Sequence, residues 1–362
     1  MKVHLGLNCG FLESFIKISK QADDLQNHFF IIYGKPVSGT IFKDKNIVAN
    51  LNFVDTLENS NPKVINLINE SSTIFIHFLS DEVIYFLEKC DLKNKKIVWL
   101  LWGTDGFSLP EVYNNLSQFR FDYLTKIGGK IKRVFYKKKS AQNKLNFINR
   151  IDYVAHYIQK DFELLQPLLK PSAKLVYFTY GVLEHIVEKI DLQGSDIILG
   201  NSAAKTNNHL FALQNILPKN SDKIIYCPLS YAADEDYIND VIKTGTKLFG
   251  NQFKPYTELL ETSNYYSEVL SKTKFAIMAH NRSQAWGNIM QLLWQGSQVY
   301  MFKSNNLYKF LKQRGFIIFA LDKKNKLNYV DEEVDLTKNR ILLEQQFSIN
   351  VLLEHYKKLL LI

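Results

Sequence analysis

Residues 195–210 read SDIILGNSAAKTNNHL and contain the parts of a strand–loop–helix unit. The apolar run predicts a buried strand at 195–200, and a helix is expected at 206–216. Gly200 lets the backbone come close to a ligand, while the loop amides and the helix N-terminus can hold an anion such as a diphosphate. The same letters also fit a plain tight turn with a Ser or Thr cap. Neither GxxxxGK[ST] nor GxGxxG is present.

Similar units recur on both sides of this stretch. Their apolar runs lack polar alternation, which is typical of parallel strands covered on both faces by helices. Expected strands are 2–7, 28–33, 73–78, 96–102, 151–156, 174–178, 195–200, 223–227, 274–279, 298–302 and 316–320. Expected helices are 11–22, 61–70, 81–90, 110–126, 159–169, 206–216, 235–248, 263–272, 285–295 and 305–314.

The pattern predicts an α/β fold with two Rossmann-like domains. Gly181 and Gly194 interrupt it, so we expect an N-terminal Rossmann-like domain at 1–180 and a second one at 181–340. Residues 341–362 are expected to form a C-terminal amphipathic helix. Two such domains would face each other across a cleft at the carboxyl ends of their strands, where open parallel sheets bind ligands. This architecture alone fits glycosyltransferases, periplasmic-type binding proteins and some dehydrogenases.

A second polar loop, AHNRSQAWGN, occupies 279–288 between two apolar segments. Arg282 offers a bidentate fork for phosphate or sugar hydroxyls, and Gln284 and Asn288 can both donate and accept hydrogen bonds. Gly287 allows close approach of a ligand. The alternative is a capped loop with a solvated arginine.

A third loop follows the apolar stretch at 96–102 and reads WGTDGF over 102–107. Asp105 lies where the first sheet would meet a ligand. A carboxylate there could bind an acceptor hydroxyl or take its proton, so Asp105 is the candidate catalytic residue. An Asp that makes a turn between two glycines is an equally good interpretation.

The net charge of +9 is concentrated in residues 126–150, which contain nine cations and no Asp or Glu. Interleaved aromatics indicate a segment that lies on an anionic bilayer, with Lys132, Arg133, Lys137, Lys138 and Lys139 as candidate membrane-binding residues. A solvated helix face and RNA binding are the alternatives, but no RNA-module motif accompanies the segment.

The remaining composition excludes several classes. Hydrophobic residues are 46% and charged residues 22%, which excludes wholesale disorder. Three scattered cysteines argue against a disulfide framework, and no apolar stretch is long enough to span a membrane. We therefore expect a cytoplasmic protein, peripheral on the inner face of the cytoplasmic membrane. Scattered histidines without metal-ligand spacing are interpreted as structural: His4, His28, His156, His185 and His355.

At these loops the sequence resembles glycosyltransferase family 56, the 4-acetamido-4,6-dideoxygalactose transferases of enterobacterial common antigen synthesis. The family's W-G-x-D pattern matches Trp102, Gly103 and Asp105. Its G-N-S pattern, followed by a basic residue, S/T-N and His, matches Gly200–Ser202, Lys205–Asn207 and His209. Its P-x-x-Y segment matches Pro228 and Tyr231, and R-x-Q-x-x-G matches Arg282, Gln284 and Gly287.

The resemblance implies a GT-B fold, with the acceptor bound by the N-terminal domain and the nucleotide-sugar by the second domain. It also implies transfer of an acetamido-dideoxy sugar from a dTDP-sugar to a polyprenyl-diphosphate-linked saccharide. This reaction would belong to bacterial surface polysaccharide or O-antigen synthesis. No metal or cofactor is expected, and neither is a nucleic-acid partner. The rival hypothesis is a non-catalytic nucleic-acid- or lipid-binding α/β protein that uses segment 126–150. The expected donor-binding residues are Gly200, Asn201, Ser202, Lys205, Asn207, Tyr231, Arg282, Gln284, Gly287 and Asn288.

Overall fold

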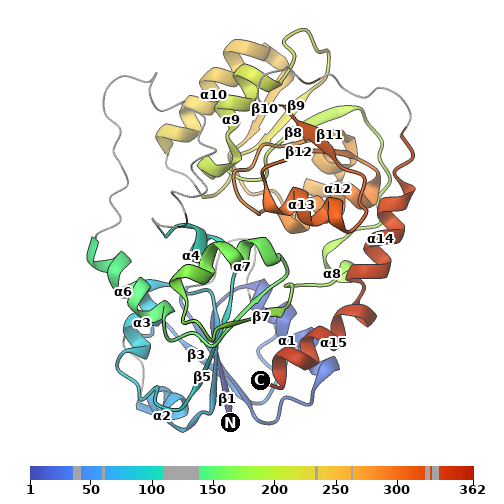
Figure 1. Ribbon diagram of the computed structural model, residues 1–362. Coiled ribbons are helices and arrows are strands. Elements are labelled where there is room, and N and C mark those ends of the chain that lie inside the picture. Colours follow the sequence, from blue (N-terminus) through green and yellow to red (C-terminus); the bar gives the residue numbers. More distant parts are fainter. Residues whose placement is uncertain are drawn as a thin grey trace. The chain divides into compact units, whose positions relative to one another are not determined.

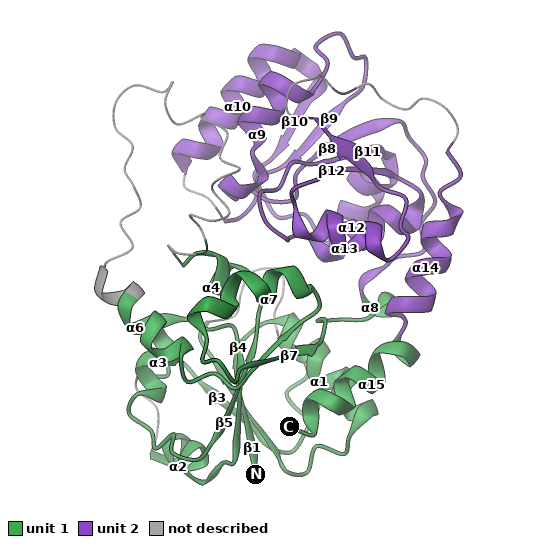
Figure 2. Ribbon diagram, in the orientation of Figure 1, with its two compact units in different colours: residues 1–115, 131–185, 349–362 green, residues 116–130, 186–348 purple. Residues whose placement is uncertain are grey.

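The structure is a computed structural model that describes residues 1–35, 42–58, 62–109, 112, 138–232, 235–261, 264–322, 327 and 334–362. The chain divides into two compact units (Figure 2). Unit 1 contains the described residues up to 112, those at 138–185, and 349–362. Unit 2 contains the described residues within 186–348.

Unit 1 is built on a parallel sheet with strand order β3-β2-β1-β4-β5-β6-β7 (Figure 1). Its register places Leu5 of the first strand opposite Ile31 on one side and Ile76 on the other, and all three are fully buried. Burial on both faces explains the uninterrupted apolar runs. The strands are β1 (Lys2–Leu7), β2 (His28–Tyr33), β3 (Leu51–Val54), β4 (Thr73–His77), β5 (Lys96–Leu100), β6 (Tyr153–His156) and β7 (Lys174–Tyr177).

Helices connect these strands, and local sequence signals set their ends. The third helix begins where the Ser80 side chain accepts a hydrogen bond from the Val83 amide, and Asp81 and Glu82 lie in its first turn. The helices are α1 (Gly10–Ala22), α2 (Pro62–Glu70), α3 (Asp81–Leu87), α4 (Thr104–Phe107), α6 (Lys138–Ile148), α7 (Gln159–Leu165), η2 (Gln166–Leu168), α8 (Leu183–Ile186) and α15 (Ile349–Leu360).

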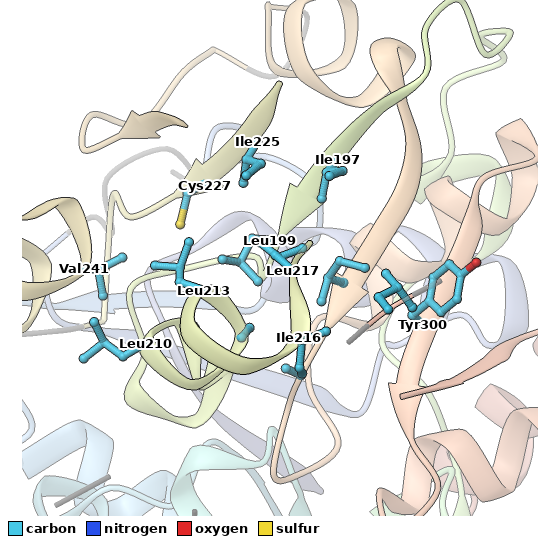
Figure 3. Packing of buried hydrophobic residues seen from close by; sticks show 14 of the residues in the cluster. Ile197, Leu199, Leu210, Leu213, Ile216, Leu217, Ile225, Cys227, Val241 and Tyr300 are labelled. Carbon is cyan, nitrogen blue, oxygen red and sulfur yellow. The ribbon is translucent and has the colours of Figure 1, made fainter. Parts of the chain in front are cut away.

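Unit 2 contains a second parallel sheet, with order β10-β9-β8-β11-β12-β13. Figure 3 shows buried side chains of its central strands packing against those of the turns that follow β8. The strands are β8 (Asp196–Leu199), β9 (Ile225–Pro228), β10 (Phe253–Tyr256), β11 (Thr273–Met278), β12 (Gln298–Phe302) and β13 (Phe319–Leu321). The helices and turns are η3 (Lys205–Asn207), α9 (His209–Phe211), η4 (Ala212–Ile216), α10 (Glu235–Phe249), η5 (Gly250–Gln252), η6 (Tyr265–Val269), η7 (Leu270–Lys272), α12 (Trp286–Gln295), α13 (Asn306–Gln313) and α14 (Thr337–Phe347).

The structure differs from the expected elements at three helices. The helix expected at 263–272 consists of a π-helical segment, η6, and a 3-10 segment, η7. The helix expected at 206–216 breaks at Asn208, which is left-handed at φ 54° and donates its side-chain amide to the Ala279 carbonyl. The helix expected at 341–361 is two helices, because Ser348 between α14 and α15 is extended. The second of these helices packs in unit 1, where Tyr356 lies between Phe15 and Phe178.

Two short strands, β3 and β10, were not expected. Both are edge strands that pair on one side only. Phe53 of β3 is 40% exposed, and β10 contains Pro255, which only an edge or a bulge tolerates. Half-exposed four-residue strands leave no apolar run in the sequence.

Some expectations fall on residues outside the described ranges. Most of the expected helix 110–126 lies there, and so do Lys132, Arg133 and Lys137 of the basic segment. Lys138 and Lys139 begin α6, whose described C-terminal part contains the buried Lys144. Within the described ranges, no helix has the length and apolar character needed to cross a bilayer. Nor do His, Cys, Asp or Glu side chains form a group of three or more in those ranges that could hold a metal ion.

Three histidines lie inside the core of unit 1, on adjacent strands. His4 of β1 is stacked between the rings of Phe30 and Phe75, each 4.4 Å from its centroid. Burial lowers the pKa of His28 to about 4 and of His77 to about 3, and it lowers the pKa of His4 well below its usual range. All three rings are therefore neutral in the folded protein at pH 7.

Because these three histidines are buried in the neutral form, we expect the free energy of unfolding to fall in acid. The unfolded chain protonates them near pH 6.5, whereas the folded protein does not until about pH 4 or below. Stability is therefore full above pH 6.5 and falls as the pH drops toward 4, by about 1.4 kcal/mol per pH unit for each proton bound only by the unfolded state. Thermal melts at about pH 7.5 and about pH 5 measure this. The His4→Phe variant should lose less Tm on acidification, and equal losses would contradict the expectation.

Candidate active site

In unit 2 the chain reverses its direction of winding between β8 and β11. From β8 it runs outward to β9 and β10, and then returns to β11 on the other side of β8. The loops that follow these two strands separate at their carboxyl ends, which is where open parallel sheets bind ligands. Residues 200–208 form the first loop and residues 279–285 form the second.

Gly200 is required by the backbone of the first loop. Its φ is +71°, its amide donates to the Ile277 carbonyl at 3.0 Å, and it ends β8. A Cβ at this position would lie 2.7 Å from both Asn207 Oδ1 and His209 Nε2. The glycine therefore brings the backbone close to two buried polar side chains that follow it.

Asn207 joins the two loops. It is fully buried, and its Oδ1 accepts from the backbone amide of Asn201 at 3.1 Å and lies 2.8 Å from His280 Nε2. Its Nδ2 donates to Ser202 Oγ and to the Ala204 carbonyl. Because Oδ1 is an acceptor in both contacts, His280 carries its proton on Nε2, and its Nδ1 is left as an acceptor.

A second set of contacts crosses between the loops nearer the surface. Gln284 Nε2 donates to Asn201 Oδ1 at 3.2 Å, and the Thr206 hydroxyl donates to Gln284 Oε1 at 2.6 Å. Asn201 Nδ2 donates to the Tyr231 hydroxyl at 3.2 Å. The structure thus brings Asn201, Ser202, Asn207, Tyr231 and Gln284 into one network.

Three buried polar atoms beside this network have no hydrogen-bond partner among the described residues: His209 Nε2, His280 Nδ1 and Ser283 Oγ. The pKa of each histidine is lowered to about 3, chiefly by burial and, for His280, also by the charge of Arg282. Both rings are therefore neutral donor–acceptor groups. Buried polar atoms are rarely left unpaired in native proteins, so this clustering indicates a place for a polar ligand.

The other expected donor-binding residues surround the network less closely. Arg282 Nη1 donates to the Ser283 carbonyl at 3.3 Å, and exposed Lys205 places its Nζ 5.6 Å from the Tyr237 ring. Gly287 and Asn288 lie in the first turn of α12. A Cβ at Gly287 would only make ordinary contact with Ile186, at 3.5 Å, so space does not require glycine there.

In unit 1, Asp105 lies in α4 with its carboxylate fully engaged. It is 2% exposed, and Oδ2 accepts from Trp99 Nε1 at 2.7 Å and from the Leu79 amide at 3.1 Å. Oδ1 accepts from the amides of Trp102 and Gly103. Burial raises the pKa of Asp105, and these bonds and buried Lys144 oppose the rise. Proton transfer by Asp105 stays a prediction, and it would require one of these donors to be released.

Aromatic rings gather at the same edge of the unit 1 sheet. Trp102 contacts the rings of Phe11, Phe78 and Tyr180 at centroid distances of 5.6, 5.7 and 5.3 Å. Phe78 follows β4 with a φ of +80°, a strained value for an aromatic residue. Asn8 Oδ1, after β1, is buried and has no partner among the described residues. We did not expect this cluster from the sequence, although aromatic or amide residues directly after β1, β4 and β5 were a signal for it.

Comparisons with known proteins agree on one fold. The sequence model of a family described as 4-alpha-L-fucosyltransferase glycosyl transferase group 56 matches residues 22–341. The Anabaena protein Alr3699/HepE, solved with UDP and glucose, superposes with a TM-score of 0.63 at 12% identity, over 99% of this chain and 98% of that one.

Two further solved structures are similar. Sucrose-phosphate synthase (tll1590) from Thermosynechococcus elongatus has a TM-score of 0.61 at 8% identity, over 99% of this chain and 98% of that one. The lipopolysaccharide outer core galactosyltransferase WaaB has a TM-score of 0.57 at 7% identity, over 100% and 99%. At these identities the likeness concerns the fold, which is GT-B, with two Rossmann-like domains.

The contacts of Asp105 predict a structural cost for its amide. In Asp105→Asn an NH₂ group replaces one acceptor oxygen, so at least one buried N–H donor loses its partner. We expect the free energy of unfolding to fall by about 2 kcal/mol or more. Denaturant unfolding measures this. The control is Asp91→Asn, an exposed Asp that accepts from the Lys93 amide, expected within about 0.5 kcal/mol of wild type. Equal stabilities for both variants would show that the four donors do not need the carboxylate.

Proposed function

Because this chain belongs to glycosyltransferase group 56 and is a glycosyltransferase, we propose that unit 2 binds a nucleoside diphosphate-sugar at the carboxyl edge of β8 and β11. The observation that carries this proposal is that His209 and His280, which lie close to Asn207, and Ser283 of the second loop each have a buried atom without a partner among the described residues, namely His209 Nε2, His280 Nδ1 and Ser283 Oγ. A polar ligand that pairs them would remove the cost of burying them, which is about 1–3 kcal/mol for each such group.

The chemistry of the loops suits the two halves of such a donor. Phosphate oxygens need N–H donors and positive charge, which the guanidinium of Arg282 supplies. The backbone amides of Gly200 and Asn201 already donate to the Ile277 carbonyl and to Asn207 Oδ1, so they hold the loop and are not phosphate ligands. Sugar hydroxyls both donate and accept, as do neutral imidazoles and the side chains of Gln284 and Ser283. These fixed dipoles would also stabilise the charge that develops on the leaving nucleotide. The Anabaena relative was solved with UDP-glucose, which supports a donor of this class.

The finer identity of the substrates is also part of the proposal. The family description names a fucosyltransferase, which favours a 6-deoxy sugar. We propose an acetamido-dideoxy sugar on dTDP, and a polyprenyl-diphosphate-linked saccharide of bacterial surface polysaccharide synthesis as its acceptor. The exposed ring of Phe11 and its neighbour Trp102 in unit 1 offer an apolar surface that the saccharide or its lipid could contact.

We also propose that segment 126–150 holds the protein on the inner face of the cytoplasmic membrane. The segment contains nine cations and no acid. Each Lys or Arg near an anionic leaflet contributes about 1 kcal/mol of binding free energy.

Arg282→Ala tests the donor site. Loss of a charge-assisted contact to phosphate should weaken dTDP or UDP binding by more than about tenfold, with Tm unchanged in the absence of nucleotide. Calorimetric titration with each nucleotide measures this and also shows which base is preferred. The control is Lys247→Ala, an exposed cation of α10 in the same unit. If wild-type protein binds neither nucleotide, the proposed function fails; if Arg282→Ala binds as tightly as wild type, Arg282 is outside the site.

Charge reversal tests the membrane proposal. Replacing Lys137, Lys138 and Lys139 with Glu should release the protein from phosphatidylglycerol vesicles and spare nucleotide binding, because the donor loops are elsewhere in the chain. Vesicle co-sedimentation over a salt series measures this, since screening weakens the electrostatic part. Equal wild-type binding to neutral and anionic vesicles would contradict the proposal. Salt-sensitive RNA binding without vesicle binding would favour a nucleic-acid partner instead.

A further inference from the structure

The three buried histidines of unit 1 form one continuous hydrogen-bonded chain. His28 Nδ1 lies 2.8 Å from His4 Nε2, and His4 Nδ1 lies 3.0 Å from His77 Nε2. His77 Nδ1 lies 2.5 Å from the hydroxyl of Tyr180. The chain crosses from the start of β2, through the middle of β1, to the end of β4 and the residues after β7.

The protons of this chain are coupled. A neutral imidazole has one N–H donor and one acceptor nitrogen, so each ring that donates on one side must accept on the other. Once one link has a direction, the other links must have the same direction. The chain therefore has two arrangements, and a proton that enters at one end drives the whole chain from one arrangement to the other while another proton leaves at the far end.

The two ends of the chain differ in their surroundings. His4 and His77 are fully buried, whereas His28 keeps 3% of its surface exposed and lies beside Asp23 and Asp24. Tyr180 is partly exposed and lies at the edge of the sheet with Trp102, near the strained Phe78. That edge follows β1 and β4, between which the strand order of this sheet reverses. One end of the chain thus reaches the ligand-binding edge and the other reaches toward the opposite edge.

We propose that Tyr180, His77, His4 and His28 form a proton relay that removes the proton from the acceptor hydroxyl during sugar transfer. This inference rests on the proposed function. If these positions served packing alone, Phe or Leu would fill them at a lower free-energy cost, because each buried imidazole must be paired at both nitrogens. Tyr180 is the catalytic residue of the relay, and the histidines act through it.

Each bond that forms in this transfer is matched by a bond that breaks. The acceptor oxygen attacks the anomeric carbon, the bond from that carbon to the phosphate oxygen breaks, and the nucleoside diphosphate leaves with the electron pair. The acceptor proton moves to the Tyr180 oxygen, the Tyr180 proton to His77 Nδ1, the His77 Nε2 proton to His4 Nδ1, and the His4 Nε2 proton to His28 Nδ1. His28 releases its Nε2 proton to water. The chain resets when water returns a proton to His28 and Tyr180 releases one in the emptied site.

The relay also explains how imidazoles of such low pKa can take part in removing a proton at pH 7. A single imidazole with a pKa near 3, as burial gives His77, is a poor base at pH 7. In a relay no ring has to store the proton, because a proton that arrives at one nitrogen leaves from the other. The working form is neutral and persists down to about pH 4, so kcat should show no limb near 6.5 from these rings. The titratable and charged groups that face the chain are Lys2, Asp23, Asp24, the N-terminal ammonium, Cys9, Asp105 and Tyr356.

The first arm of the test removes one oxygen atom. Tyr180→Phe should lower kcat by about 10²-fold or more, with dTDP affinity close to wild type. Its Tm should fall, because buried His77 Nδ1 loses its partner, but the protein should stay folded at the assay temperature. The assay uses a dTDP-sugar with membrane extract as the source of acceptor. The matched control is Tyr85→Phe, whose ring is 51% exposed on α3, and its kcat should equal that of wild type.

The second arm separates a relay from a structural hydrogen bond at the far end. In His28→Gln the amide can still hydrogen-bond to His4 but cannot pass a proton on, whereas His28→Phe loses both properties. The relay predicts that Gln restores Tm relative to Phe but leaves kcat lowered by about 10²-fold. His185→Gln, in α8 and outside the chain, is the control.

The results that overturn the relay are distinct. A folded His28→Gln with wild-type kcat would make the chain structural. A second such result is a kcat of Tyr180→Phe within about threefold of wild type, which is well short of the effect of losing a general base. If His156→Gln is inactive in that case, the base is instead the buried pair of His156 and Asp161, whose Nε2 and Oδ2 lie 3.1 Å apart. A wild-type protein that binds no nucleotide and transfers no sugar overturns the proposed function and the relay together, whereas wild-type turnover with unaffected variants overturns the relay alone.

Discussion

Every neighbouring pair of strands in both described sheets is parallel. Each connection must therefore return to the edge from which its strand began, and all the loops that follow strands collect at the opposite edge. This constraint brings Gly200 and His280 together, although they are far apart in the sequence. It likewise gathers Trp102, Phe78 and Tyr180 from three connections of unit 1. The direction of the strands, more than any single side chain, determines where both candidate sites lie.

Buried polar groups then divide into those that hold the loops and those that are available to a ligand. Asn207 and Asp105 belong to the first kind, because the hydrogen bonds of each join one loop to another part of its unit. His209, His280 and Ser283 each have an atom of the second kind. Rigid loops of this sort present their free donors and acceptors in a fixed geometry, so little reorganisation is needed when charge develops on a substrate.

The sequence predicted the interior strands well and missed two of the four edge strands. Strands such as Lys2–Leu7 and His28–Tyr33 have the expected bounds, because burial on both faces leaves a continuous apolar run. The edge strands Leu51–Val54 and Phe253–Tyr256 leave no such run. For the sites, glycine and polar clusters after strands indicated the right loops. The contact between His77 and Tyr180 spans 103 positions and depends on topology, so histidines interpreted as structural could not be joined into a chain before the strand order was known.

The path of the chain has a consequence for biosynthesis. Helix α15 supplies fully buried side chains to unit 1, among them Tyr356, Leu359 and Leu360, and the carbonyl of Leu360 accepts from Lys2 near the start of β1. Unit 1 therefore lacks part of its core until α15 has left the ribosome, although β1 is synthesised long before that helix. Unit 2 contains all the strands of its sheet before that moment. Unit 2 can thus fold before unit 1, in which α1 keeps an apolar surface uncovered until α15 is available.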